Sequence, residues 1–580
     1  MKTERDLRRQ LEAIDRRGYP AYKSLRGAYD MGDFTLSIDR VQGDPFAAPS
    51  RASVKLSAAQ AGIPIDLVDA PHRRVAVEDR LIRRFAREAA RVSFSVHGSG
   101  KSGLIATSDP GPEVLARSAC EVGADGSVIL RLEVGFPAHG RTVEARGLAR
   151  MLCELVPACV ERALVCDRRA RVELGRAVEL ADDQHAIRDE LERRRLVAFV
   201  ADGSVLPRAG GASSAPMEDA RPFASPASLR VELDLPHRGR VAGMGIRRGI
   251  TLIVGGGYHG KSTLLQALQE GVYDHVAGDG RELVITDAAA VKLRAEDGRP
   301  VHAVNVSPFI ACLPDGRDTS RFSTDDASGS TSQAASVIEA LEAGCRTLLV
   351  DEDTSATNFM VRDALMEAVV ARESEPITPF VERVRDMWER SGVSCVIVAG
   401  SSGAFFTVAD TVVQMERYEP RDITDRAREA CRAHGVGAAC AARPYVLPTG
   451  FRPVPDVVRR SCAAPPARRG RKGAAPREER LKVRVRGLDE FAVGAGMADV
   501  RAIEQLVDSE QTAALAQLVR CAARRGLLDG SRALADVVAE LFDAVRTRGW
   551  SVLAEHGEVS CGLALPRPQE LFACLNRWRG

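Results

Sequence analysis

A glycine-rich segment is the first part of the sequence whose residue types and spacing could do chemistry. Gly255-Gly256-Gly257-Tyr258-His259-Gly260-Lys261-Ser262 fits the pattern G-x-x-x-x-G-K-[ST] and stands between the apolar run ITLIV and the helical pattern STLLQALQ. Glycines let successive backbone N–H groups point at phosphates, and the start of a helix adds partial positive charge. Lys261 is expected to reach the β- and γ-phosphates, and the Ser262 hydroxyl to ligate Mg²⁺. With Thr263, the segment therefore predicts a nucleoside triphosphate site, and its strand, loop and helix context argues against a mere glycine-rich turn.

Two adjacent carboxylates follow a second apolar run. Leu348-Leu349-Val350 leads into Asp351 and Glu352. Asp351 is expected to hold Mg²⁺, and Glu352 to polarise the attacking water, so that Glu352 and Lys261 are the predicted catalytic residues. Adjacent acids at the end of a strand are often only solvated, so the flanking sequence decides between the two interpretations.

The flanking sequence resembles the ABC-type ATPases. Ser328-Gly329-Ser330-Thr331-Ser332-Gln333 precedes the acidic pair, and Ser355-Ala356-Thr357-Asn358 follows it. In that superfamily a signature loop opens a helix, and the acidic strand and a D-loop follow. With the signature serine laid on Ser328, 23 residues separate it from Asp351, which is the register that the superfamily leads us to expect. The resemblance implies that Ser328, Gly329 and Ser330 contact the γ-phosphate held by Lys261 of a second subunit, and that 355–358 form the D-loop.

More of the chain resembles one family, the predicted ATPases of the ABC class from bacteria and protists. The segments that carry this resemblance include YPAYKSLRGAY, VQGDPFAAPSR, VAFVADGSVLPR, VYDHVAGDGRE, VKLRAEDGR, EPITPF, EQLVDSEQ and LNRWR. They are spread over nearly the whole chain. The resemblance implies ATP binding and hydrolysis with ATP and Mg²⁺, but little about the client of the ATPase.

The sequence departs from the ABC pattern at two positions. No glutamine occurs between residues 270 and 332, where a Q-loop glutamine is expected, and Asn305-Val306-Ser307-Pro308 stands in its place. The position of the switch histidine falls on Gly400, with Ser401 next; a hydroxyl replaces part of the histidine's hydrogen bonding but not its charge. Both departures predict slow hydrolysis. The short interval from Lys261 to Ser328 argues against a transporter ATPase.

The sequence predicts three domains. Residues 1–222 mix helices and strands as an α+β domain, and 209–226 has the composition of a linker. In 223–420, buried strands alternate with helices, which predicts an α/β fold, a P-loop ATPase core with a mostly parallel sheet. Residues 421–580 are expected to be mainly helical, with a basic linker at 459–486.

Composition limits the compartment and the partners. The 580 residues hold 81 Lys+Arg and 79 Asp+Glu, a net charge of +2, so any affinity for polyanions must be local. We expect a cytoplasmic protein. No apolar run is long enough to cross a membrane, and the charged first residues, MKTERDLRRQ, have no apolar segment behind them that would indicate a signal peptide. The thirteen cysteines form no C-x-x-C pair and are expected to be reduced.

Two further segments have both a functional and a structural interpretation. Residues 468–486 hold nine basic and two acidic residues, a local charge of +7, which fits either contact with RNA or DNA phosphates or a solvated connector. The segment 98–103, GSGKSG, is interpreted as a structural turn rather than a second phosphate loop, because its first glycine is missing and no clear helix follows.

These features predict a soluble ABC-class ATPase that closes and opens as a homodimer around ATP and acts on a cytosolic client, with RNA preferred. Two alternatives stay open. One is a nucleotide-gated scaffold with little turnover, and the other is a P-loop kinase of a small molecule.

Overall fold

The computed structural model describes residues 1–580 except 212, 371, 438–444, 449–450, 464–480 and 555–556. It divides into two compact units: Met1–His185 with Arg548–Leu565, and Ala186–Thr547 with Pro566–Gly580. The boundaries of these units differ from those of the three predicted domains, 1–222, 223–420 and 421–580. That these three domains are separate folding units stays a prediction.

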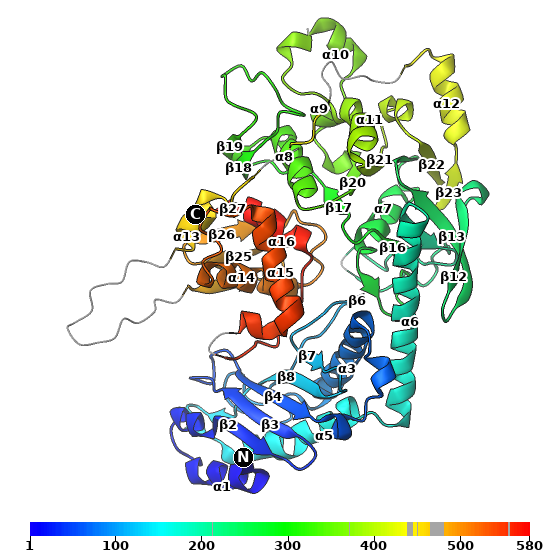
Figure 1. Cartoon of the computed structure of the whole chain (residues 1–580). Helices are drawn as coiled ribbons and strands as arrows, with labels where there is room; N and C mark the ends of the chain where they lie inside the picture. The colour runs from blue at the N-terminus through cyan, green and yellow to red at the C-terminus, as the bar shows by residue number, and fades with distance from the viewer. Residues whose placement is uncertain (212, 371, 438–444, 449–450, 464–480, 555–556) are drawn as a thin grey trace, which may run out of the picture. The chain divides into compact units, whose positions relative to one another are not determined.

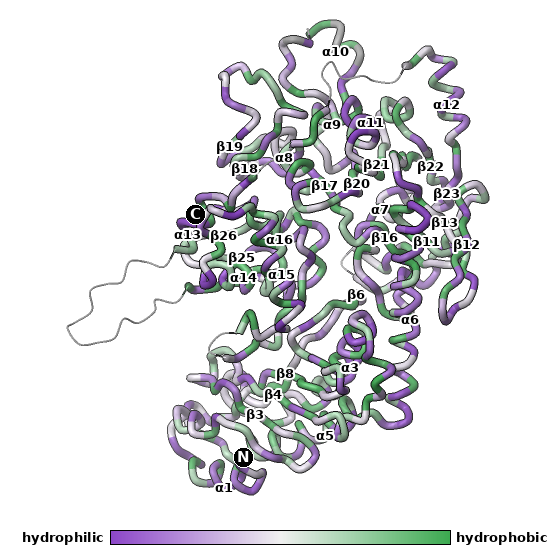
Figure 2. Tube along the Cα trace, in the orientation of Figure 1, coloured by the Kyte–Doolittle hydropathy of each residue, from purple (hydrophilic) through white to green (hydrophobic). Residues whose placement is uncertain are grey.

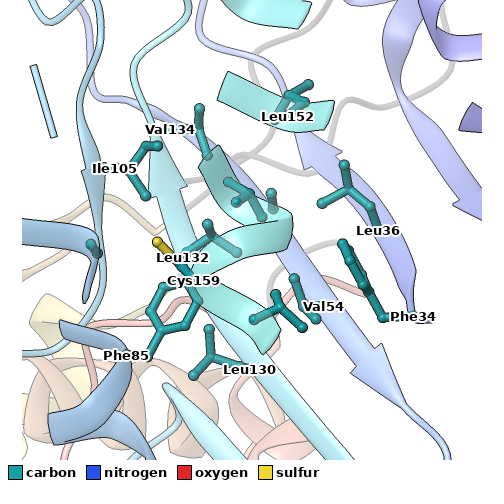
Figure 3. Close-up of a cluster of buried hydrophobic side chains, with 14 of the residues drawn as sticks. Phe34, Leu36, Val54, Phe85, Ile105, Leu130, Leu132, Val134, Leu152 and Cys159 are labelled. Atoms are coloured by element: carbon teal, nitrogen blue, oxygen red, sulfur yellow. The ribbon is translucent and has the colours of Figure 1, made fainter. Parts of the chain in front are cut away.

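The first unit is built on a seven-stranded sheet in the order β1-β2-β3-β4-β8-β5, with β7 also pairing with β8. Strand β8 alternates strictly between buried and half-buried residues, as expected for a sheet with one face in the core. Figure 3 shows Val54 of β4 and Leu132 of β8 near Phe85 of α3 and Cys159 of α5, and all four belong to one buried hydrophobic cluster. The sheet and these two helices therefore form the α+β fold predicted for this part of the chain.

The strands before residue 150 are β1 (Lys2–Thr3), β2 (Gly27–Asp30), β3 (Thr35–Arg40), β4 (Ser50–Leu56), β5 (Ile105–Ala106), β6 (Glu113–Val114), β7 (Cys120–Val122), β8 (Val128–Val134), β9 (Ala138–His139) and β10 (Thr142–Val143). The helices up to the start of the second unit are α1 (Glu4–Ile14), α2 (Ala58–Ala61), α3 (Pro71–Val92), α4 (Ala145–Arg150), α5 (Val156–Leu164) and α6 (Arg168–Arg193).

The second unit contains the sheet that carries the candidate site, in the order β17-β20-β21-β14-β22-β23. All neighbours in it are parallel except β23, which runs antiparallel to β22. Every residue of β20 and β21 is buried, which requires cover on both faces of the sheet. Helix α7 covers one face and helices α8 and α11 cover the other (Figure 1). The predicted α/β core with a mostly parallel sheet is therefore confirmed.

The strands of the core are β14 (Ile250–Val254), β17 (Val291–Leu293), β20 (Thr347–Asp351), β21 (Ser394–Val398), β22 (Thr411–Glu416) and β23 (Glu419–Asp422). Its helices are α7 (Lys261–Glu270), α8 (Gly329–Glu342), α9 (Thr357–Met360), α10 (Ala364–Val369), α11 (Phe380–Ser391) and α12 (Thr424–Ala433). In Figure 2 the central strands β20 and β21 are largely hydrophobic, whereas α6 is largely hydrophilic.

Smaller sheets surround this core. Strands β11 (Leu196–Ala201), β12 (Arg230–Leu235), β13 (Gly239–Arg247) and β16 (Val284–Thr286) form an antiparallel sheet in the order β12-β13-β11-β16. Strands β18 (Arg299–Val304) and β19 (Phe322–Ala327) pair with each other, and β15 spans Asp274–His275.

The C-terminal part of the second unit combines helices with a small sheet. Its helices are α13 (Asp456–Ser461), α14 (Ser509–Arg524), α15 (Leu534–Arg548) and α16 (Pro568–Asn576). Its antiparallel sheet consists of β24 (Val483–Arg486), β25 (Glu490–Val493), β26 (Gly496–Asp499) and β27 (Trp578–Arg579). The helical character is as predicted, and the four short strands are an addition to the prediction. Among the described residues, no helix has the length and apolar character needed to cross a membrane.

Candidate functional site

The predicted phosphate loop lies between β14 and α7, and its glycines are required by the backbone. Gly255 and Gly260 have φ values of 144° and 97°, in a region that disfavours side chains. A Cβ at Gly255 would lie 2.4 Å from the Met415 carbonyl oxygen, and one at Gly260 would lie 2.8 Å from the Tyr418 ring. The loop therefore passes so close to β22 and the turn after it that only glycine fits at these two positions.

Lys261 begins α7, and its side chain folds back over the loop. The Nζ donates hydrogen bonds to the carbonyl oxygens of Gly255, at 2.7 Å, and Gly256, at 2.9 Å. The ammonium thus lies against the loop that a phosphate would occupy, and a bound phosphate would compete with the two carbonyls for it.

The other predicted ATP-binding residues lie around Lys261. Tyr258 is fully exposed, with its whole side chain in solvent, and Gly257 is exposed beside it. His259 has a structural contact, because its Nδ1 accepts the Arg417 N–H at 3.1 Å. Ser262 is exposed and Thr263 half-buried in the first turn of α7.

Asp351 ends β20 and is 8% exposed. Burial raises the pKa of the Asp351 carboxyl above its usual value, although the N–H of Asp353 donates to its Oδ1 at 3.2 Å. A buried acid with one backbone donor, and with a second carboxylate oxygen that accepts no hydrogen bond from the described residues, suits a role as a cation ligand, directly or through water.

Glu352 contacts the predicted switch position directly. Its Oε2 accepts the N–H groups of Gly400, at 2.7 Å, and Ser401, at 3.0 Å, and its Oε1 accepts the Ser401 hydroxyl at 2.6 Å. Burial alone would raise the pKa of Glu352, but these hydrogen bonds to its charged form lower the pKa below its usual value. Glu352 is therefore held as a carboxylate in one orientation.

The same loop also approaches Lys261. A Cβ at Gly400 would lie 3.8 Å from the Lys261 Nζ, within ordinary contact distance. The fold thus brings together Lys261, Glu352, Gly400 and Ser401, from three separate parts of the sequence.

The predicted signature residues open helix α8. Ser328 is its N-cap, and the Ser328 Oγ accepts the Thr331 N–H at 3.5 Å and donates to the Thr331 hydroxyl at 3.0 Å. Ser330 is buried, with its Oγ 3.4 Å from that of Ser328, whereas Ser328 is exposed. Within the described part of the chain, no hydrogen bond joins these residues to the loop at 255–263. The helix N-terminus at the exposed Ser328 is available to an anion from outside the chain, which would compete with Thr331 for the Ser328 hydroxyl proton.

Gln333 connects the signature helix to the D-loop, a role that the sequence reasoning did not give it. Its side chain is 1% exposed; the Nε2 donates to the Ser355 hydroxyl at 2.8 Å, and the Oε1 accepts the Ala356 N–H at 2.9 Å. Ser355 in turn donates to the Asp351 carbonyl at 2.7 Å. Thr357 and Asn358 are exposed at the start of α9. The sequence feature that could have indicated this role is the position of Gln333 at the end of the signature motif.

The segment in the place of the Q-loop forms a local turn. The Asn305 Oδ1 accepts the N–H of Ser307 at 3.1 Å and its hydroxyl at 2.6 Å. Asn305 therefore stabilises its own turn, and its predicted correspondence to the Q-loop position stays a prediction.

The structure describes the first of the two segments with competing interpretations fully and the second only in part. In the 98–103 loop, Ser99, Lys101 and Gly103 donate their N–H groups to the carbonyls of Ala138, Pro45 and Gly135, which favours a structural turn. Most of the basic linker 459–486, including Arg468, Arg469, Arg471, Lys472, Arg477 and Arg480, lies outside the described residues. Lys482, Arg484 and Arg486 are exposed at and in β24.

Comparison with known proteins gives matches along most of the chain. A family model described as the P-loop domain of ABC_ATPase matches residues 170–447, one described as ATPase of the ABC class N-terminal matches 4–167, and one described as MRB1590 C-terminal domain matches 482–580. A curated relative, the uncharacterized protein MJ1628 of Methanocaldococcus jannaschii, is 29% identical over 249 residues. That alignment spans 41% of this chain and about half, 54%, of the relative.

Among solved structures, cbiO1 from Clostridium perfringens, described as part of the ABC transporter complex cbiONQ, matches 39% of this chain and 87% of its own. The sequence identity is 15% and the TM-score 0.24, a similarity that carries no argument.

The contacts of Glu352 lead to a prediction about pH. Ser401→Ala removes a hydrogen bond that favours the charged carboxylate, so the pKa of Glu352 should rise. The acidic limb of the pH dependence of ATP hydrolysis should then move to higher pH. Because the native pKa lies below the unfolded value, the carboxylate stabilises the fold above the unfolded pKa, and this stability is lost as the pH falls through the native pKa. The variant should therefore lose less stability on acidification than the natural chain.

Ser402→Ala is the matched control, because the Ser402 hydroxyl accepts the Ala404 N–H, whereas its backbone N–H, which the substitution keeps, is the group of Ser402 that lowers the pKa of Glu352. Rate profiles against pH, together with the pH dependence of the denaturation midpoint, measure both effects. Identical acidic limbs for Ser401→Ala and Ser402→Ala would rule out the assigned role of Ser401.

Proposed function

Because the chain belongs to the family of ABC-class P-loop ATPases, we propose that it binds ATP with Mg²⁺ at the 255–263 loop and hydrolyses it between two copies of the chain. The observation that carries this proposal is the meeting of Lys261, Glu352 and Ser401 at one edge of the parallel sheet. A cation for the phosphates and a fixed carboxylate for the attacking water are the two groups that phosphoryl transfer to water requires.

The donor set fits Mg²⁺. Ser262 offers an exposed hydroxyl and Asp351 a buried carboxylate, and Mg²⁺ usually takes one or two protein oxygens with phosphate oxygens and waters. Among the described residues, no group of three or more His, Cys, Asp and Glu side chains could hold a metal ion. Bound Mg²⁺ would neutralise charge on the β- and γ-phosphates.

The role proposed for Glu352 is to orient a water molecule, and its environment supports slow turnover. The hydrogen bonds from Ser401 and Gly400 fix the carboxylate but also lower its pKa, which weakens it as a base. The absence of a Q-loop glutamine and a switch histidine also supports slow turnover.

Ser328 is the residue proposed to contact the ATP bound by a second subunit. It is an exposed N-cap at the N-terminus of α8, with Gly329 half-buried and Ser330 buried behind it. The partial positive charge of this helix N-terminus supports the proposal that Ser328, Gly329 and Ser330 contact the γ-phosphate held by Lys261 of another copy. ATP would then join the two copies, and hydrolysis would release them.

The proposed client is RNA, and the proposed location is the cytoplasm. The support for RNA is the local charge of +7 at 468–486 in a chain of net +2, together with the exposure of Lys482, Arg484 and Arg486. A nucleotide-gated scaffold with little turnover is the second candidate, and it is favoured by the hydrogen bonds that already occupy Glu352.

Lys261→Ala should weaken the binding of ATP with Mg²⁺ by about a hundredfold or more, because it removes a charged donor aimed at the phosphates. Isothermal titration calorimetry measures the affinity. Gln266→Ala is the control, since Gln266 is exposed on the same helix and its side-chain amide donates to Glu270. Equal affinities for Lys261→Ala and the control would refute the assignment of the loop.

Glu352→Gln should keep the affinity for ATP but lower the hydrolysis rate by about 10²–10⁴-fold, because the carboxylate that orients water is lost. In saturating ATP it should accumulate as a dimer. Ser328→Arg should bind ATP and remain a monomer, because the larger side chain blocks the partner's phosphate. Light scattering measures both masses.

Glu389→Gln is the control for the loss of a charge, because Glu389 is an exposed glutamate of α11. A Glu352→Gln protein that stays monomeric in saturating ATP would refute closure around ATP.

The RNA proposal predicts a steep salt dependence of binding to single-stranded RNA, with a slope of about −0.7 per phosphate neutralised. Changing Arg468, Arg469, Arg471 and Lys472 to alanine should flatten this slope without altering the affinity for ATP. Changing the exposed Arg5, Arg9, Arg16 and Arg17 to alanine removes the same charge at another place and should leave the slope unchanged. If the first quadruple variant keeps the slope of the natural chain, 468–486 is only a connector.

A further inference from the structure

A short segment of the C-terminal part lies between the phosphate-loop helix and strand β17. Gln505 is 4% exposed and uses its whole amide: the Oε1 accepts the Lys292 N–H at 3.0 Å, and the Nε2 donates to the carbonyls of Gln269 and Ala290, each at 3.2 Å. One side chain from the C-terminal part therefore completes the hydrogen bonding of two separate pieces of the ATPase core.

Side chains of the ATPase core also donate hydrogen bonds to the main chain of the same segment. The Gln269 Nε2 donates to the Glu504 carbonyl at 2.7 Å, and the Tyr273 hydroxyl donates to the Gln505 carbonyl at 2.8 Å. Gln269 lies in the last turn of α7, the helix that begins with Lys261. The 504–505 segment is thus fixed in position relative to the phosphate-loop helix.

Lys292 links the 504–505 segment to the residue that precedes the D-loop. Its side chain is 4% exposed, and the Nζ lies 3.2 Å from the Glu504 Oε2 and 3.2 Å from the Thr354 hydroxyl. Thr354 stands between Glu352 and Ser355, and its hydroxyl lies 3.4 Å from the Asp351 carbonyl. A continuous set of contacts therefore runs from Glu504 through Lys292 to the loop that follows the predicted catalytic acids.

A buried ammonium makes this arrangement sensitive to the position of Glu504. An ammonium removed from water needs a close counter-charge, and the loss of one partner of a buried pair costs much more than the loss of an exposed pair. If Glu504 moves away, the Lys292 ammonium keeps the Leu293 carbonyl, at 3.4 Å, and the Thr354 hydroxyl as acceptors but loses its counter-charge. Its position against Thr354, the residue that leads into the D-loop, is then less firmly fixed.

We propose that Lys292 is a positioning residue that holds the D-loop in place only while Glu504 of the C-terminal part is seated against it. This inference rests on the proposed ATP-driven cycle, in which the D-loop stands beside the composite site. A client that displaces the 504–505 segment would slow hydrolysis. Any change that the client causes in the affinity for ATP would be matched by an equal factor in the effect of ATP on the client's affinity.

Arg294 supplies a matched control. Its NH1 pairs with the other carboxylate oxygen of Glu504, at 3.0 Å, and its side chain is more exposed than that of Lys292. Lys292→Met therefore leaves Glu504 with a counter-charge, so the fold should survive. Arg294→Met removes the other pair to the same carboxylate without touching Thr354.

The experiment compares Lys292→Met, Thr354→Val, Lys292→Arg and Arg294→Met in the full chain. Hydrogen exchange of the backbone amides in 351–358 reports the order of the D-loop, and steady-state kinetics report turnover and KM for ATP. Lys292→Met and Thr354→Val should speed exchange in 351–358 and lower kcat by about two- to thirtyfold, with KM little changed. Lys292→Arg should restore part of both, and Arg294→Met should match the natural chain.

Two outcomes would overturn the inference. One is unchanged exchange in 351–358 for both Lys292→Met and Thr354→Val, which keeps its meaning even if Lys292→Met folds poorly, because Thr354→Val removes only the hydroxyl. The other is an equal effect of Arg294→Met, which would indicate a general loss of packing. A natural chain without measurable hydrolysis would contradict the proposed ATPase, while the exchange data would still decide the role of Lys292.

Discussion

The parallel pairing of β14, β21 and β20 is the constraint on which the rest of the site depends. Ile253 of β14 lies opposite Val398 of β21, and Val398 lies opposite Asp351 of β20. The three strands therefore end in register, and the loops that leave them carry Lys261, Ser401 and Glu352. Because parallel strands direct their carboxyl ends to the same edge of a sheet, groups more than 90 residues apart in sequence meet without any long side chain having to reach across.

Helix α8 links this edge to the signature loop. Gln333 holds the D-loop, the Ser332 hydroxyl accepts the Glu296 N–H at 2.8 Å, and the buried Glu339 pairs with Arg299 at 2.6 Å. A helix fixed at three points along its length moves as one piece with its neighbours. In the proposed dimer, a displacement of Ser328 by the partner's phosphate would therefore also move the D-loop, which follows Glu352 in the chain.

The parts of the site that the sequence predicted are those with local signals. The strand, glycine loop and helix around Lys261 are contiguous, and counting from β21 found Gly400 and Ser401, which the structure brings to Glu352. Lys292 and Glu504 could not be found in this way, because their contact joins positions 212 residues apart and neither belongs to a motif with a chemical meaning of its own. The sheet of β24 to β27 was missed because its strands have two to four residues, too few to establish an alternating pattern.

The central claim is that Lys261 of one copy and Ser328 of another build a single site, and a subunit-mixing experiment tests it most directly. Lys261→Ala and Ser328→Arg chains should each be inactive alone. A mixed dimer keeps one intact pair, Lys261 from one chain and Ser328 from the other. Because neither variant should close with a copy of itself, the dimers of an equimolar mixture should all be mixed, and the mixture should recover up to about half of the natural ATPase rate, since each mixed dimer holds one of two symmetric sites. A mixture that is no more active than the sum of its two components would contradict the shared site.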